Sequence, residues 1–217
     1  RELQITCPKC GQTTKAEQCD RCQYVPTIED MKDGVCLECG SKVILKDNKN
    51  LYLALSKFQK EIEDYVKEND ALWRINAKNE TNKYLKQGLV DRAVTRDLDW
   101  GVDIPVEGYE SKKMYVWIEA VLGYITATMK KCEETGKNWE EFWKNEYDPT
   151  IYMVHGKDNI VFHSIIFNSL LLAMKENYHL VNTIVSSEYL NINDEKISKS
   201  KGNGTPAIEL VEKYGVD

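Results

Sequence analysis

The sequence of 217 residues has no apolar run long enough to cross a membrane. A spanning helix needs about 20 consecutive apolar residues, and polar side chains interrupt the longest apolar stretch, residues 160–174. Basic residues are also in the minority, because 29 Lys and Arg stand against 35 Asp and Glu. The net charge of −6 argues against extensive wrapping of nucleic acid but permits a local basic site. With 42% apolar residues the chain can bury a sizeable core, and its length suggests one or two domains with no membrane partner.

Histidine is scarce, with three residues in the chain, whereas cysteine is not. Six of the seven cysteines stand in three Cys-x-x-Cys pairs, and no secretory signal is visible. This usage favours reduced thiols and metal binding over disulfides, so we expect a cytoplasmic protein. The chain opens abruptly at Arg1, and a preceding piece is expected.

The first two cysteine pairs lie eight residues apart: Cys7 and Cys10, then Cys19 and Cys22. Two such pairs, each on a tight turn, are typical of a tetrahedral four-thiolate zinc site. A dithiol redox pair and an iron–sulfur site are the alternatives. Four thiolates close the coordination shell, so the predicted Zn²⁺ is structural.

The third pair, Cys36 and Cys39, is followed by Gly40 and lacks two further ligands in the first half of the chain. It is either free of metal or completes a second site with cysteines that precede Arg1. Cys132 falls in an amphipathic pattern, which favours a small packing residue over a metal ligand.

Periodicity predicts helices and strands that alternate after residue 89. Expected helices cover residues 56–69, 80–87 (ending at Gly88), 116–130, 159–175 and 206–214, and expected strands cover 114–116, 150–154 and 183–186. Strand–helix alternation is the pattern of a parallel sheet with crossover helices.

A cationic loop follows the last expected strand. Lys196, Ser198 and Lys199 lie in the run Lys-Ile-Ser-Lys-Ser, ahead of Lys201 and two glycines. Lysine suits phosphate as a point charge, and mobile cations can stabilise a leaving pyrophosphate. By charge alone, a solvated surface loop is the alternative.

Three further patterns have ordinary structural explanations when each is taken alone. Trp117, Ala120, Val121 and Tyr124 occupy one helical face, which by periodicity is core packing. His163 stands on an apolar helical face, where a core histidine is the usual case. Residues 156–158 form a strand–helix turn, and ligands of open parallel sheets bind at such carboxyl ends.

Taken together, three ordered segments resemble the methionyl-tRNA synthetases, a family of class I aminoacyl-tRNA synthetases. They are Tyr115–Tyr124, His155–His163 and Lys196–Ser200, and residues 95–101 match in kind. The cysteine pairs come in the expected order, so the resemblance covers essentially the whole chain.

The resemblance implies the second half of a Rossmann-type parallel-sheet catalytic domain with a small zinc-knuckle insertion. The implied divisions are a connective insertion at 1–90 (zinc knuckle 1–46, then a helical part), the catalytic half at 91–187, and the Lys-Ser loop with the start of a stem-contact region at 188–217. An outer cysteine pair upstream would then complete a second site with Cys36 and Cys39.

The resemblance also implies roles for individual residues. The methionine pocket comprises Trp117, Ala120, Val121, Tyr124 and His163. ATP contacts Gly156, Asp158, Lys196, Ser198 and Lys199, and of these Lys196 and Lys199 are the expected catalytic residues, acting on pyrophosphate with Mg²⁺. The implied reaction is ATP-dependent activation of methionine and its transfer to methionine tRNA.

One departure qualifies this expectation. The family's His-x-Gly-His stretch and its anticodon-binding domain have no counterpart in this sequence. We therefore expect a fragment that is inactive by itself and needs the N-terminal catalytic half. The alternatives are a class I synthetase for valine, isoleucine, leucine or cysteine, a zinc-ribbon nucleic-acid-binding module on an α/β domain, and a purely structural fragment.

Overall fold

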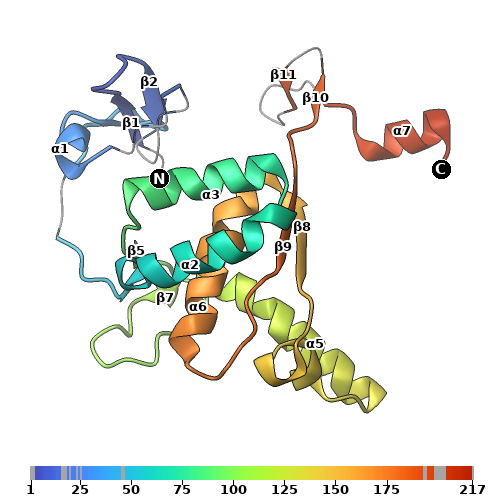
Figure 1. Ribbon diagram of the computed structural model, residues 1–217. Helices are drawn as coiled ribbons and strands as arrows, with labels where there is room; N and C mark the ends of the chain where they lie inside the picture. Colours follow the sequence, from blue (N-terminus) through green and yellow to red (C-terminus); the bar gives the residue numbers. More distant parts are fainter. Residues whose placement is uncertain are drawn as a thin grey trace. The chain divides into compact units, whose positions relative to one another are not determined.

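The computed structural model describes residues 3–15, 19, 21–22, 24, 26–44, 47–192, 195–197 and 204–216. The chain forms two compact units, Arg1–Lys49 and Asn50–Asp217 (Figure 1). Within the described residues, no helix is both long and apolar enough to cross a membrane.

The first unit is built around a small antiparallel sheet. Its strands are β1 (Leu3–Thr6), β2 (Thr13–Lys15) and β3 (Val35–Cys36), in the order β2-β1-β3. Helix α1 (Ile28–Met31) begins at a capping box, in which Thr27 and Asp30 satisfy each other's backbone N–H groups. With so few apolar side chains, such a unit typically needs a metal to hold its fold.

Two helices open the second unit. The predicted helix at 56–69 is confirmed as η1 (Leu55–Phe58) continued by α2 (Gln59–Asn69), and a short turn, η2 (Asp70–Leu72), follows. Helix α3 (Ile75–Gln87) starts five residues before the prediction and ends at Gly88 as expected, because φ of +82° there suits glycine.

The parallel strand pair is the centre of the second unit. Strands β8 (Tyr152–Gly156) and β9 (Thr183–Ser187) run side by side in parallel, with Tyr152 opposite Thr183 and Gly156 opposite Ser187 (Figure 1). The connection between them passes through η6 (Lys157–Asn159), η7 (Phe162–Ile166) and α6 (Phe167–Met174). The predicted strand–helix–strand unit is therefore confirmed.

The crossover helix is not uniform. Segment η7 is a turn of π-helix, and it leads directly into α6. Asn168 is fully buried and its amide donates to the carbonyls of His163, at 2.9 Å, and Ser164, at 3.1 Å. The Oδ1 atom of Asn168 accepts from the Val181 N–H at 3.0 Å. One side chain thus satisfies backbone groups of the π-turn and ties them to the segment before β9.

One predicted strand is wrong in its extent and its partner. Residues 114–116 were expected in the parallel sheet, but β7 (Lys113–Met114) pairs antiparallel with β6 (Thr95–Arg96), and Val116 begins a helix. Strand propensity indicates an extended backbone without naming the partner strand. Here the partner is β6, the strand that immediately precedes β7 in the chain, and not a strand of the parallel pair.

The single helix predicted at residues 116–130 is instead three successive helical segments. These are α4 (Val116–Glu119), η3 (Ala120–Leu122) and α5 (Gly123–Thr135). Cys132 is buried in α5, which confirms its predicted role as a packing residue. The remaining elements are β4 (Tyr52–Leu53) with β5 (Arg92–Ala93), η4 (Trp139–Phe142), η5 (Asn145–Tyr147), β10 (Asn191–Ile192) with β11 (Glu195–Lys196), and α7 (Ala207–Tyr214).

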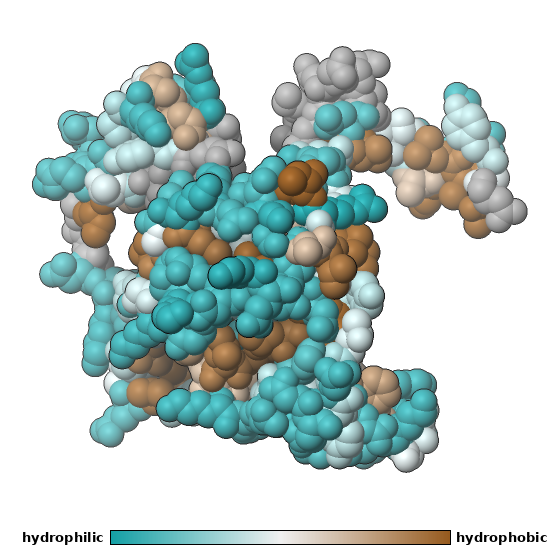
Figure 2. Space-filling model, viewed as in Figure 1, coloured by the Kyte–Doolittle hydropathy of each residue, from teal (hydrophilic) through white to brown (hydrophobic). Residues whose placement is uncertain are grey.

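A single hydrophobic cluster joins α2, α3, α5, α6 and the β8–β9 pair. Phe167 lies at its centre, fully buried, with its ring 6.0 Å from that of Trp143 in an edge-on arrangement. In contrast, apolar side chains along α7 are exposed, among them Ile208 and Tyr214 (Figure 2).

Candidate functional site

Four cysteines of the first unit converge as the sequence predicts. The sulfur atoms of Cys7, Cys10, Cys19 and Cys22 all lie within 4.8 Å of one another. Two pairs, Cys7 with Cys22 and Cys10 with Cys19, are 3.6 Å apart. Tetrahedral zinc with four thiolates needs sulfur–sulfur separations of about 3.8 Å, so the arrangement fits the metal.

The local backbone explains this convergence. The N–H of Gly11 donates to the Cys7 carbonyl at 2.9 Å, and the N–H of Cys7 donates to Gln12 at 2.9 Å, which closes the turn. Gly11 has φ of +70°, a conformation that favours glycine. A hydrogen bond from the backbone N–H of Cys22 lowers the pKa of Cys19 to about 6. Burial and the neighbouring sulfurs raise the pKa of Cys22 to about 12, so of these two thiols Cys19 is the one that favours the thiolate, the form that binds metal.

The third pair has the same turn but not the same surroundings. Gly40 N–H donates to the Cys36 carbonyl at 2.8 Å and Cys36 N–H to Ser41 at 2.9 Å, as in the first turn. Cys39 donates to the Ser41 hydroxyl at 3.3 Å. Among the residues described, Cys36 and Cys39 belong to no cluster of three or more ligands. A second zinc at this pair stays a prediction.

In the second unit, aromatic side chains from α4 and α5 meet the π-turn η7. The Trp117 ring lies 5.4 Å from that of Phe162, and the Tyr124 ring lies 5.6 Å from that of His163. Trp117 is 46% exposed and Tyr124 43% exposed, and the Tyr124 ring also lies 6.1 Å from that of the buried Phe167. The two rings thus contact adjacent residues of one turn, Phe162 and His163, whereas a shared substrate site for Trp117 and His163 stays a prediction.

The other two predicted pocket residues differ from each other. Ala120 is exposed, whereas Val121 is buried in the hydrophobic cluster. Contact of either residue with a substrate stays a prediction.

His163 is buried, and both of its ring nitrogens have partners. Its Nδ1 lies 2.9 Å from the Asn159 carbonyl, which only accepts, so Nδ1 carries the proton. Its Nε2, 2.9 Å from the Tyr124 hydroxyl, then accepts from that hydroxyl in the neutral imidazole. Burial lowers the pKa of His163 below its ordinary value, which favours this neutral form.

His155 belongs to this site and was not predicted. Its ring stacks on that of His163 with centroids 4.3 Å apart and planes 18° apart. Burial also lowers the pKa of His155. Strand alternation was the missed signal, since residue 155 lies on the same face of β8 as the buried Met153.

The carboxyl ends of β8 and β9 border a cavity of about 310 Å³ lined by Arg74, Val154, His155, Val185 and Ser187. Gly156, a predicted adenosine contact, ends β8, and its φ of −73° is open to any residue. Asp158 follows in η6, exposed, and accepts a hydrogen bond from Tyr189. The structure thus places Gly156 and Asp158 at the sheet edge where nucleotides bind in such folds.

The predicted catalytic loop is only partly described. The backbone of Lys196 lies in β11, opposite Asn191 of β10. Ser198 and Lys199 lie outside the described residues, so their approach to the aromatic site stays a prediction.

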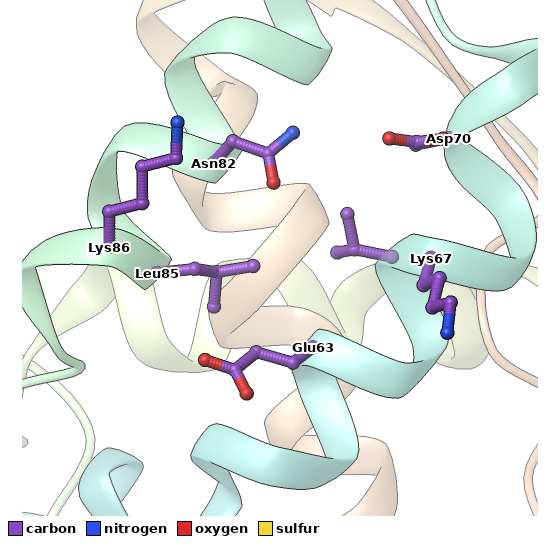
Figure 3. A pocket seen from close by; sticks show the side chains of 7 residues that line it. Glu63, Lys67, Asp70, Asn82, Leu85 and Lys86 are labelled. Atoms are coloured by element: carbon purple, nitrogen blue, oxygen red, sulfur yellow. The ribbon is translucent and has the colours of Figure 1, made fainter.

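A cavity of similar size, about 330 Å³, lies elsewhere, between α2 and α3 (Figure 3). Its apolar floor includes Leu85, and Glu63, Asp70 and Lys86 line its charged rim. None of the predicted site residues lines it, so cavity size alone does not identify the site.

Known proteins resemble the chain over its whole length. A family model described as tRNA synthetases class I (M) matches residues 1–217. Methionine–tRNA ligase 1 of Alkaliphilus oremlandii is 42% identical over 217 residues, covering 100% of this chain and 40% of that protein. Methionine–tRNA ligase of Bacillus mycoides is 44% identical over 219 residues, with the same coverage. The chain therefore spans 40% of the length of these relatives.

A solved structure is also similar. It is methionyl-tRNA synthetase of Mycobacterium tuberculosis bound by methionyl-adenylate, with 25% identity and a TM-score of 0.65. The match covers 85% of this chain and 34% of that one.

The cysteine cluster predicts metal-dependent folding of the first unit. We expect about one zinc ion per chain from these four thiolates, lost on Cys19→Ser substitution. Cys132→Ala, which removes a buried cysteine of the second unit, should retain the metal. Elemental analysis of the purified chains measures both, and zinc retained at full stoichiometry by Cys19→Ser would contradict the assignment.

The lowered pKa of His163 predicts a pH dependence of stability. The unfolded chain binds a proton near the usual value of about 6.5, while the folded chain binds it only at lower pH. The free energy of unfolding should therefore decrease as pH falls from about 7 to 5. Urea denaturation at several pH values measures this free energy, which should decrease less with falling pH in His163→Gln than in the unsubstituted chain. The same pH dependence in both chains would refute the expectation.

Proposed function

The chain belongs to the class I tRNA synthetases (M), and we propose that it carries part of the active site of a methionine–tRNA ligase. One observation carries the proposal: the half-exposed Trp117 and Tyr124 contact Phe162 and the neutral His163, two adjacent residues of η7, and His163 stacks on His155 near the carboxyl end of β8. Aromatic walls suit a flexible thioether, because sulfur makes favourable contacts with rings. The sheet edge suits the nucleotide.

The proposed reaction has two steps. The carboxylate of methionine attacks the α-phosphorus of ATP, the bond to the bridging oxygen breaks, and pyrophosphate leaves. A ribose hydroxyl at the end of methionine tRNA then attacks the carbonyl carbon of the adenylate, and AMP leaves. Positioning and neutralisation of charge supply most of the rate in such chemistry.

The residues of this chain divide that work. Trp117 and Tyr124 hold the methionine side chain, and His163 orients Tyr124 through the hydrogen bond to its Nε2. Gly156 and Asp158 contact adenosine, while Lys196, Ser198 and Lys199 hold the phosphates together with Mg²⁺. His163 takes no proton in the first step, because the attacking carboxylate is already ionised.

Zinc has a structural part in this proposal. Cys7, Cys10, Cys19 and Cys22 would hold it, and a closed four-thiolate shell leaves no position for a substrate. The metal thus fixes the fold of the knuckle at residues 1–46 within a connective insertion at 1–90. Residues 91–187 form the second half of the Rossmann-type domain, and 188–217 carry the loop and the start of the stem-contact region.

Exposed side chains on β8 support the idea that further protein completes the site. Tyr152 is 61% exposed and Val154 76% exposed, on the outer face of a sheet that has only two described strands. Such a small sheet is marginal alone. A catalytic half carrying the His-x-Gly-His stretch would cover this face, and an anticodon-binding domain would complete recognition of tRNA.

The proposal is tested in the complete synthetase that contains this chain. ATP–pyrophosphate exchange should depend on methionine and should not be supported by valine, isoleucine, leucine or cysteine. Calorimetry should detect methionine binding to the complete protein and not to the 217-residue chain. Exchange that prefers one of the other amino acids would exclude the methionine assignment.

Replacement of Lys199 separates the phosphate site from the methionine site. Lys199→Ala should slow adenylate formation by about 10²–10³-fold, the range for loss of one charge-stabilising group, while the Kd for methionine stays the same. The exposed Lys130→Ala on α5 serves as the control and should leave both values unchanged. A normal exchange rate in Lys199→Ala would remove this residue from the catalytic set.

A further inference from the structure

Tyr189 links the segment after β9 to the turn that follows β8. Its hydroxyl donates to Oδ1 of Asp158, and its ring lies under Lys157, whose Nζ is 4.5 Å from the ring centroid. Burial, together with the neighbouring Asp158 carboxylate, raises the pKa of Tyr189 to about 12. The hydroxyl therefore keeps its proton at neutral pH and remains a donor.

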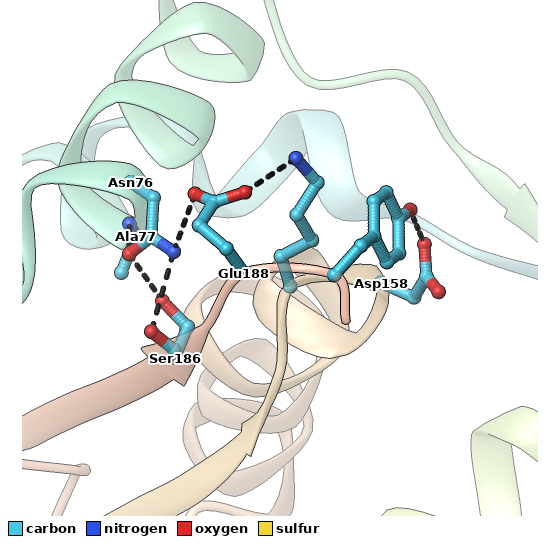
Figure 4. Close-up of polar contacts among 7 residues, drawn as sticks. Asn76, Ala77, Asp158, Ser186 and Glu188 are labelled. Carbon is cyan, nitrogen blue, oxygen red and sulfur yellow. Dashed lines mark hydrogen bonds and ion pairs between the residues drawn. The ribbon is translucent and has the colours of Figure 1, made fainter. Parts of the chain in front are cut away.

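Glu188, the preceding residue, holds Lys157 in this position. Its Oε2 lies 2.6 Å from Lys157 Nζ, and its Oε1 accepts from the Asn76 amide at 2.9 Å (Figure 4). Both hydrogen bonds lower the pKa of Glu188, and the one from Lys157 has the larger effect. The carboxylate thus bridges the start of α3 and the turn after β8.

Asn76 anchors the network to the sheet. Its Nδ2 also donates to the Ser186 carbonyl at 3.2 Å, and its Oδ1 accepts from the Ser186 hydroxyl at 2.6 Å and from the Ala77 N–H at 2.8 Å. Ser186 is buried at the end of β9. An amide whose donors and acceptor are all engaged has one orientation, so Glu188 has a fixed partner.

The position of the network matters more than its strength. Glu188 and Lys157 are partly exposed, and such ion pairs contribute little to stability. However, the network fixes the Asp158 carboxylate at the carboxyl edge of the sheet. A carboxylate accepts several hydrogen bonds, so donation by Tyr189 is compatible with a second donor such as a ribose hydroxyl.

Tyr189 also lies two residues before β10, which pairs with β11, the strand in which the Lys196–Ser200 run begins. One side chain therefore connects the turn that carries Asp158 to the root of the hairpin that carries Lys196.

We propose that Tyr189 and Glu188 are positioning residues for the nucleotide: Tyr189 orients Asp158 toward a ribose hydroxyl of ATP, and Glu188 holds Tyr189 in place through Lys157. This inference rests on the proposed function, because it assumes that ATP binds at this edge. Tyr189 and Glu188 would then contact neither the reacting atoms nor the nucleotide, and would act only through Asp158.

Tyr189→Phe in the complete synthetase tests the first part. The KM for ATP in pyrophosphate exchange should rise about tenfold, the scale of one hydrogen bond to a charged group, while the KM for methionine stays unchanged. Tyr52→Phe removes the hydroxyl of an exposed tyrosine in β4 and is the matched control. An unchanged KM for ATP, or an equal rise for methionine, would overturn the proposal.

Nucleotide analogues show whether Tyr189 acts through the ribose. With 2′-deoxy-ATP or 3′-deoxy-ATP, whichever lacks the hydroxyl that Asp158 binds, the penalty of Tyr189→Phe should fall to less than about twofold, because the interaction is already missing. An undiminished penalty with both analogues would assign Tyr189 a structural role only.

A double substitution tests the link to Glu188. Glu188→Gln should also raise the KM for ATP. The double variant with Tyr189→Phe should have a KM for ATP close to that of Tyr189→Phe alone, since both residues act on Asp158. Fully additive effects would break the link. If the unsubstituted enzyme shows no methionine-dependent exchange, the proposed function fails; if it is active and these variants match it, only the present inference fails.

Discussion

The parallel pairing of β8 with β9 is the constraint on which the second unit depends. Parallel strands require a crossover, and here it runs through η6, η7 and α6. The pairing brings the ends of both strands to one edge, so that Asp158 from the first turn lies beside Tyr189 from the second. The aromatic groups on η7 follow from the same crossover, because that turn begins only a few residues after β8.

Three polar side chains of this crossover, His163, Ser164 and Asn168, are buried and paired, which keeps their geometry definite, whereas the buried Ser169 hydroxyl has no hydrogen-bond partner among the described residues. Asn168 satisfies two carbonyls of the π-turn and one N–H before β9. The Ser164 hydroxyl accepts from Thr81 at 2.8 Å, which connects the turn to α3. Since an unpaired polar group would be costly here, these contacts specify one position for the neighbouring His163. Its neutral imidazole and the Tyr124 hydroxyl then form a hydrogen bond of fixed geometry among aromatic side chains.

Local sequence signals predicted the elements that depend on local chemistry. Two Cys-x-x-Cys pairs eight residues apart predicted the cluster of Cys7, Cys10, Cys19 and Cys22, and helical periodicity predicted α2. The same signals failed where the pairing partner decides the outcome: Lys113 and Met114 pair antiparallel with β6 while Val116 begins a helix, and His155 stacks on a residue eight positions away across a turn. The substrate roles predicted for Ala120 and Val121 came from the family resemblance, because periodicity alone predicts only that these residues pack in a core.

By itself, the sequence determined where most helices and the two parallel strands lie, which four thiols lie close enough to hold a metal, and to which family the chain belongs. These properties follow from residue spacing and from ordered motifs, and both can be read without coordinates. Only the tertiary structure decided that His155 backs His163, and that Asn76, Glu188 and Tyr189 form one network with Asp158. Asn76 lies 112 positions from Glu188 in sequence, and a contact of that separation is created only when the helix packs against the end of the sheet.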